Sequence, residues 1–142
     1  MRALALAACL AASAASAQDA TRLIDVEKAK HLPSPVLPGV ATAVLLGSRD
    51  EPGLYMTHAR LKAGARVPPY THPNTLTTVV TSGTAWVGTG TRFDEAALVP
   101  YPSGSVFVTP AGSPHFIMAR TGPFSILDHG SGPSGFALAD DG

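Results

Sequence analysis

The chain has 142 residues, enough for one domain with a single hydrophobic core. Charged residues make up only 14%, and the 10 Lys and Arg residues balance the 10 Asp and Glu residues, so no basic surface for nucleic acid is expected. The 14 Gly and 13 Pro residues separate short apolar runs, which is typical of many turns rather than of disorder.

Residues 1–17 are typical of a secretory signal peptide. Arg2 gives a short positive start, an apolar run follows, and the motif ASA at residues 15–17 is a cleavage signal. The run is too short to span a bilayer, so we expect no membrane span. We predict a mature chain that starts at Gln18, lacks cysteine and is periplasmic or secreted. The alternative is a lipoprotein modified at Cys9.

We predict that residues 18–39 form an N-terminal extended segment ahead of the main domain. Residues 21–30 fit a short helix and a strand equally well. Pro33, Pro35 and Pro38 then favour extended backbone, because the residue before a proline avoids the helical conformation.

From Val40 onward the pattern is a series of short strands separated by turns. Many β-branched strands at roughly 8–12 residue spacing are typical of an all-β sandwich or barrel. We predict a barrel over residues 40–133 and a flexible tail over 134–142. Residues 88–104 are predicted to be the longest loop. The predicted strands are 40–46, 54–61, 67–72, 76–81, 84–87, 105–109, 115–119 and 124–129.

Five apolar side chains lie in predicted strands without a charged neighbour, and we expect them in the core. They are Val80, Trp86, Val106, Phe107 and Ile117.

Two predicted strands carry histidines that a barrel could bring together. Tyr70 and His72 share a face, because side chains alternate along a strand, and His115 begins another strand. Neutral imidazole is the commonest metal ligand, so two of them converging in a barrel would make a plausible metal site. A strand histidine is more often packed or exposed than ligating, so both interpretations stay open. His31 and His58 are expected to be structural or exposed.

Two motifs resemble those of the cupin superfamily. Residues 64–83 fit the frame G-x5-H-x-H-x3,4-E-x6-G, and residues 104–119 fit the frame G-x5-P-x-G-x2-H-x3-N, each without gaps. The stretch between them has 20 residues, within the usual cupin range. The segments LPGVATAVLLG, RLKAGARVPPYTHP and DHGSGP are similar to those of small, often exported, single-domain cupins of the conserved-barrel type. The resemblance covers about residues 36–133 and implies a cupin jelly-roll barrel.

The resemblance also implies where a metal would bind. Cupin metals are held by two His and a Glu of the first motif and by the His of the second. His72 and His115 match, but Tyr70 stands at the first His position and Leu76 at the Glu position. With two of four ligands absent, a divalent metal (Zn, Cu, Ni or Fe) is expected to bind weakly or not at all. The alternatives for a third ligand are Tyr70 as a phenolate and His129 at the barrel mouth, on a face with Ser125 and Leu127.

We therefore predict a small-molecule pocket with a degenerate, two-histidine metal site, for binding rather than clear catalysis, and we assign no catalytic residue. The first alternative is a metal-dependent enzyme of dioxygenase or isomerase type that uses His72, His115 and an atypical third ligand. The second alternative is a structural or interaction module. The resemblance also allows for a homodimer.

Overall fold

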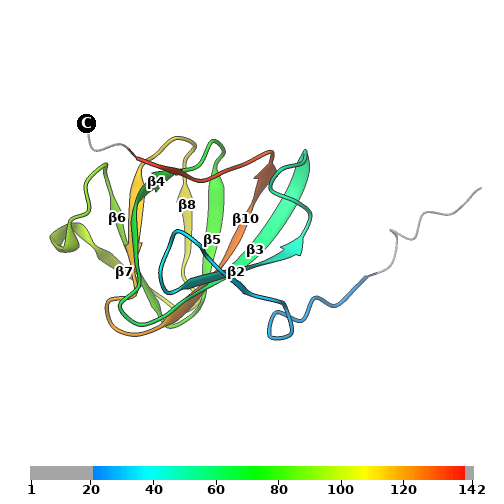
Figure 1. The fold of residues 1–142 in the computed structure, drawn as a ribbon, viewed down its shortest axis with the longest axis horizontal. Helices are drawn as coiled ribbons and strands as arrows, with labels where there is room; N and C mark the ends of the chain where they lie inside the picture. The colour runs from blue at the N-terminus through cyan, green and yellow to red at the C-terminus, as the bar shows by residue number, and fades with distance from the viewer. Residues whose placement is uncertain (1–20, 140–142) are drawn as a thin grey trace, which may run out of the picture.

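Two antiparallel β-sheets face each other across the core in the computed structural model, which describes residues 21–139 (Figure 1). The predicted signal peptide and the last three residues of the predicted tail lie outside the described residues. Between residues 21 and 139, no helix is both long and apolar enough to cross a membrane.

The first sheet has six strands and the second has five. The first sheet contains, in spatial order, β1 (Leu32–Pro33), β2 (Val40–Leu46), β3 (Gly53–Leu61), β10 (Phe124–Gly132), β5 (Leu76–Ser82) and β8 (Val106–Thr109). The second contains β11 (Ala137–Leu138), β4 (Arg66–Thr71), β9 (His115–Met118), β6 (Thr84–Thr89) and β7 (Val99–Pro102). One short 3-10 helix, η1 (Glu95–Ala97), lies between β6 and β7. The predicted all-β class is confirmed.

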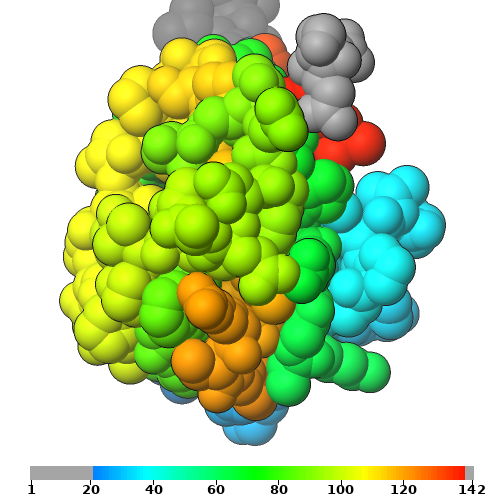
Figure 2. Space-filling view, turned by 90° about the vertical axis from the view of Figure 1, so that its left-hand side faces the viewer, coloured from blue at the N-terminus to red at the C-terminus, as the bar shows by residue number. Residues whose placement is uncertain are grey.

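The predicted loop over residues 88–104 was wrong in part, because it contains η1 and β7. Strand β7 pairs with β6 in the register Thr84↔Pro102. Pro100 and Pro102 made this segment look unlike a strand, because proline cannot donate a hydrogen bond to a β-ladder. Proline is tolerated here because β7 is an edge strand. Figure 2 shows the segment between β6 and β7, drawn yellow-green, over the middle of one side of the molecule.

The start of the predicted flexible tail is also different in the structure. Residues 134–139 return along the second sheet, where β11 pairs with β4 and the Ala139 amide donates to the Pro69 carbonyl over 2.8 Å. Phe136 packs against the main core cluster. The Gly and Ser content suggested looseness, but burial of one phenylalanine ring and a row of backbone hydrogen bonds hold this segment in place.

The segment ahead of β2 contains neither the helix nor the strand considered for residues 21–30. It has one turn, in which the Lys28 amide donates to the Asp25 carbonyl over 3.2 Å. Glu27 then pairs with Arg60 of β3 at 2.8 Å, and β1 pairs with β2. The segment is thus held against the six-stranded sheet.

The core confirms part of the predicted list. Val80 and Ile117 are buried, and Phe107 is a partly buried neighbour of the main cluster. Trp86 is half-buried. The prediction for Val106 was wrong, because its side chain is 60% exposed. Strand β8 is at the edge of its sheet, and its alternate side chains face solvent.

Gly88 marks a close approach between β6 and β9. A Cβ atom at this position would lie 2.2 Å from Cε2 and from Cζ of Phe116, whose ring is fully buried. The same strand pair sets Thr89 opposite His115. The position of His115 therefore depends on a strand spacing that only glycine permits at residue 88.

Candidate functional site

The structure brings the two predicted histidines together inside the barrel. His115 is the first residue of β9 and pairs with Tyr70, while His72 directly follows β4. Both imidazoles are buried, and their ring centroids are 5.5 Å apart. The strand pattern left a packed or exposed histidine open as well, and the cupin resemblance favoured this convergence.

Backbone carbonyls determine the tautomer of both rings. Nδ1 of His72 is 2.7 Å from the Gly135 oxygen, and Nδ1 of His115 is 3.1 Å from the Ser113 oxygen. A carbonyl only accepts, so each Nδ1 carries the hydrogen and each Nε2 of a neutral ring keeps a lone pair. Burial, the main cause, lowers the pKa of both histidines, which favours the neutral form. Among residues 21–139, no side chain or backbone group is hydrogen-bonded to either Nε2.

Tyr70 lies beside the pair but as a neutral phenol. Its ring centroid is 4.1 Å from that of His115 and 5.2 Å from that of His72. Burial, and then the nearby Asp128 carboxylate, raise the pKa of Tyr70 well above its ordinary value. The phenolate that a metal ligand requires is therefore disfavoured. Leu76, at the position of the motif glutamate, is buried and offers no ligand atom.

His129 does not join the two histidines. Its side chain is exposed, whereas the interior face of β10 is formed by Phe124, Ile126 and Asp128. The predicted register placed the odd-numbered residues at the barrel mouth, but the apolar even-numbered side chains take the interior.

Asp128 is a site residue that the motif search missed. It is buried, and the Thr78 hydroxyl donates to its Oδ1 over 2.7 Å. Burial raises the pKa of Asp128, against the opposing effects of Thr78, Arg49 and His72. The sequence did contain a signal for it. Asp128 is two residues after Ile126 and four after Phe124, so it shares a strand face with two apolar side chains.

Arg49 is a second missed residue, from the loop between β2 and β3. Its Nη2 donates to the Thr57 hydroxyl over 3.1 Å, but its buried Nε has no partner among the described residues. Arg49 lines a cavity of about 90 Å³ together with Tyr70, His72 and Asp128. Such a volume holds about three water molecules, which would satisfy the Nε hydrogen.

A larger cleft adjoins the other histidine. Its volume is about 390 Å³, and His115 lines it with the rings of Tyr101 and Phe107 and with Val87. The two rings of its wall pack together with centroids 5.0 Å apart. Each histidine of the pair thus lines a different space. One is a small cavity with a few polar groups in a mostly apolar wall, and the other is a larger, mostly apolar cleft.

The residues do not fit a tightly held metal. Within residues 21–139, no three His, Cys, Asp or Glu side chains lie close enough to share an ion. The available set is two imidazole nitrogens, a neutral phenol and a leucine, while protein metal sites usually supply three or more ligands. The pair suits at most a weakly held, nitrogen-preferring ion.

Comparisons with known proteins agree with this barrel. The family described as Cupin matches residues 41–127. No curated protein matches. Among solved structures, the polyketide cyclase RemF from Streptomyces resistomycificus has a TM-score of 0.67 at 14% identity, over 86% of this chain and 89% of that one.

Two further solved structures differ in their stated activity. A cupin-superfamily sugar phosphate isomerase from Silicibacter pomeroyi has a TM-score of 0.65 at 19% identity, over 84% of this chain and 82% of that one. A salicylate 1,2-dioxygenase from Pseudaminobacter salicylatoxidans has a TM-score of 0.60 at 21% identity, over 75% of this chain and 32% of that one. Likeness at such identities establishes the fold and not the reaction. The family match spans more than half of the residues, and with the two motifs and the jelly-roll barrel it shows that this chain belongs to the cupin family.

Proposed function

We propose that this cupin binds a small molecule against the His72–His115 pair, without a tightly held metal. The fixed tautomers of the two rings carry the proposal. Because each Nδ1–H is held by a backbone carbonyl, each Nε2 can accept a hydrogen bond from a ligand without rotation of the ring.

The cleft beside His115 suggests the ligand class. Its volume of about 390 Å³ lies in the range of small-molecule sites. Tyr101 and Phe107 offer aromatic surface, and His115 offers an acceptor nitrogen. The matching ligand has a flat apolar body and at least one hydroxyl or amino group that donates.

The small cavity beside His72 would supply polar contacts to the site. Arg49 contributes a buried donor there, and Asp128 and Tyr70 contribute further polar atoms. Ordered waters in this space would connect these groups to a ligand in the cleft.

Phenol tests the proposal, with anisole as a probe of similar shape that cannot donate. We expect phenol to shift the NMR resonances of cleft residues and anisole to bind more weakly. Replacing His115 by alanine should weaken phenol binding about three- to tenfold, the value of one neutral hydrogen bond. His129→Ala, on the exposed face of β10, is the matched control and should have no effect. Equal binding of phenol and anisole would contradict the proposed role of the pair.

A metal-dependent enzyme is the second candidate. The carbonyl contacts at both Nδ1 atoms support it, because metal-ligating histidines usually donate their other N–H to such a group. Elemental analysis of the purified protein separates the two candidates. Stoichiometric metal that disappears in His115→Ala would favour the enzyme and overturn the metal-free proposal.

We also propose that the protein is exported. The support is the motif ASA at residues 15–17 after a positive start and an apolar run. Mass spectrometry of protein from the periplasm or medium should give Gln18 as the first residue. A cytoplasmic chain that still begins at Met1, or a lipid on Cys9, would contradict this.

A further inference from the structure

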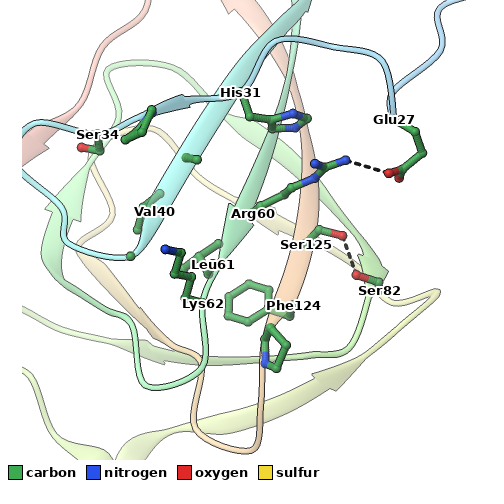
Figure 3. A pocket seen from close by; sticks show the side chains of 14 residues that line it. Glu27, His31, Ser34, Val40, Arg60, Leu61, Lys62, Ser82, Phe124 and Ser125 are labelled. Atoms are coloured by element: carbon green, nitrogen blue, oxygen red, sulfur yellow. Dashed lines mark hydrogen bonds and ion pairs between the residues drawn. The ribbon is translucent and has the colours of Figure 1, made fainter.

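A second pocket, here called the outer pocket, lies at one end of the six-stranded sheet, where β2 and β10 begin and β3 and β5 end (Figure 3). Its volume is about 620 Å³. The lining includes apolar side chains, two cations and three hydroxyls, from Leu61, Phe124, Arg60, Lys62, Ser34, Ser82 and Ser125. It shares no residue with the cleft beside His115.

A chain of hydrogen bonds connects the N-terminal segment to this pocket. Nδ1 of His31 is 2.9 Å from the Ala29 oxygen, and Nε2 of His31 is 2.8 Å from Nδ1 of His58. Nε2 of His58 is 3.2 Å from the Thr81 hydroxyl oxygen. His58 is buried, while His31 is partly buried and lines the pocket.

Two serine hydroxyls continue the chain to the pocket wall. The Ser125 hydroxyl is 2.7 Å from that of Thr81 and 2.6 Å from that of Ser82. Figure 3 shows Ser82 and Ser125 bonded to each other near Arg60. The last hydroxyl, that of Ser82, therefore lies at the pocket.

The neutral chain has one possible direction. The Ala29 carbonyl accepts, so His31 carries its hydrogen on Nδ1 and accepts at Nε2 from Nδ1–H of His58. Nε2 of His58 must then accept from Thr81. The only hydroxyl hydrogen of Thr81 is then donated to His58. Ser125 must therefore donate to Thr81, and Ser82 must donate to Ser125. In this state the Ser82 hydroxyl hydrogen points toward Ser125 and away from a ligand in the pocket.

One added proton reverses the direction. Whether the charge is placed on His31 or on His58, Nε2 of His58 now carries a hydrogen and donates to Thr81. Thr81 then donates to Ser125, Ser125 donates to Ser82, and the Ser82 hydrogen is released toward the pocket. A second proton is excluded, because two N–H groups would face each other across the 2.8 Å contact.

The charges around the pocket favour an anion. Of the ionisable lining residues other than His31, Glu27 is acidic and Arg60 and Lys62 are basic, and Glu27 pairs with Arg60 at 2.8 Å. Asp25 and Lys28 of the N-terminal segment pair with each other. Protonation of the histidine pair would add one more positive charge beside this lining.

We propose that the outer pocket binds a small carboxylate with an apolar body, and that each bound anion is accompanied by uptake of one proton at the His31–His58 pair. Val40, Leu61 and Phe124 contact the apolar body, and Lys62 and the Ser82 hydroxyl bind the carboxylate. Binding and protonation strengthen each other reciprocally.

The direction of the pH dependence follows from the surroundings of the pair. Burial is the main cause that lowers the pKa of His58, followed by His31 and Arg60, while Glu27 acts in the opposite sense. The free His58 ring therefore favours its neutral form near pH 7, and a bound carboxylate raises the affinity of the site for a proton. Anion binding should be strong at acidic pH and lost as the pH rises through the pKa of the complex.

Benzoate is the probe, and its neutral analogue benzamide is the control. Calorimetric titration of the full protein in two buffers of different ionisation enthalpy gives both the affinity and the protons taken up. We expect benzoate affinity to fall by up to about tenfold per pH unit above the pKa of the free pair, with about one proton taken up per anion. Benzamide should bind weakly and without pH dependence. A benzoate affinity that does not change with pH would overturn the proposal.

NMR locates the binding and reports on the chain. Benzoate should shift the amide resonances of Phe124 and Ser125 and place a hydrogen on Nε2 of His58. Ser82→Ala, at an exposed position, should weaken benzoate binding about tenfold at acidic pH, because a hydrogen bond to a charged group is lost. His129→Ala should bind benzoate like the wild type. Shifts confined to the cleft beside His115, or an unchanged affinity in Ser82→Ala, would contradict the assigned site.

Discussion

The chain contains two histidine pairs, and they differ in how their ring nitrogens are used. In the interior pair, His72 and His115, each ring is held by its own backbone carbonyl, and the ring centroids are 5.5 Å apart. In the outer pair, His31 and His58 are bonded directly to each other over 2.8 Å. The interior pair thus presents two acceptors to a ligand, whereas the outer pair uses its nitrogens internally.

This difference shows that proximity of histidines does not define a metal site. Both pairs are close in space and His58, like the interior pair, has a pKa lowered mainly by burial. Only the interior pair leaves an imidazole nitrogen free on each ring. The outer pair can instead share a single proton and pass its effect along a row of hydroxyls.

The largest expected effect concerns the packing that holds the interior pair in place. The interior pair depends on β9, whose Phe116 is fully buried directly after His115. Phe116→Ala should lower the free energy of unfolding by about 3–5 kcal/mol, measured by urea denaturation. Phe107→Ala, with a half-buried ring, is the matched control and should cost clearly less. A loss below about 1 kcal/mol for Phe116→Ala would show that β9 is not anchored in the core.

Metal binding should separate the two pairs directly. We expect weak binding of Ni²⁺ or Zn²⁺ and none of Mn²⁺, because hard cations prefer the oxygen ligand that Leu76 has replaced. His72→Ala and His115→Ala should each weaken Ni²⁺ binding by at least about tenfold, since one imidazole remains. His58→Gln should leave it unchanged. Calorimetry of the four proteins tests this, and loss of Ni²⁺ binding in His58→Gln would reverse the roles of the pairs.

The same comparison can be sharpened by restoring the lost ligands. Tyr70→His combined with Leu76→Glu should recover Mn²⁺ or Fe²⁺ binding in the interior site, because four ligands would then be present. Failure to bind any metal would show that His72 and His115 do not converge on one point.

A smaller effect is expected when the backbone carbonyl that fixes the His72 tautomer is loosened. The Gly135 carbonyl that accepts from His72 precedes Phe136, whose ring packs on Tyr70 with centroids 4.8 Å apart. Phe136→Ala should loosen this carbonyl and mix the two tautomers of His72. His115, held by Ser113, should keep its tautomer and serves as the internal control. Nitrogen-15 NMR of the rings measures both, and a parallel change in the two histidines would contradict their independent support.

The smallest expected effect is the pH dependence of stability. His58, His72 and His115 have pKa values lowered by burial, so the folded state binds fewer protons than the unfolded state below about pH 6.5. Stability should be fully present above that pH and decrease as the pH falls toward the folded-state pKa values. Urea midpoints at pH 5 and pH 8 test the sign. His58→Gln should show a shallower decrease, and an identical slope would mean that His58 titrates normally.

The fold was largely predictable because its signals are local. Glycine and proline punctuation placed most strands, and the two motifs with their cupin resemblance indicated that His72 and His115 could meet, which the pairing of β4 with β9 brings about. Alternation alone did not predict which face of β10 points into the barrel. A register that differs by one residue would put His129 inside in place of Asp128. A register shift between Ser125 and Ile126 adds to the ambiguity of this strand.

The outer pair was beyond sequence reasoning for a different reason. His31 and His58 lie 27 residues apart, and the segment that carries His31 has no periodic pattern to orient it. Its position results from the backbone pairing of β1 with β2 and from the ion pair of Glu27 with Arg60, two contacts that no local sequence signal predicts.

Gly88 has a consequence for how this sequence can vary. Since a methyl group at residue 88 would overlap the Phe116 ring, Gly88→Ala should be strongly destabilising unless residue 116 also becomes smaller. Gly88→Ala should therefore be less destabilising in a Phe116→Leu background than in the wild type, with a coupling energy of about 0.5–3 kcal/mol between the substitutions. In related sequences, a residue larger than glycine at position 88 is therefore expected only together with a side chain smaller than phenylalanine at position 116.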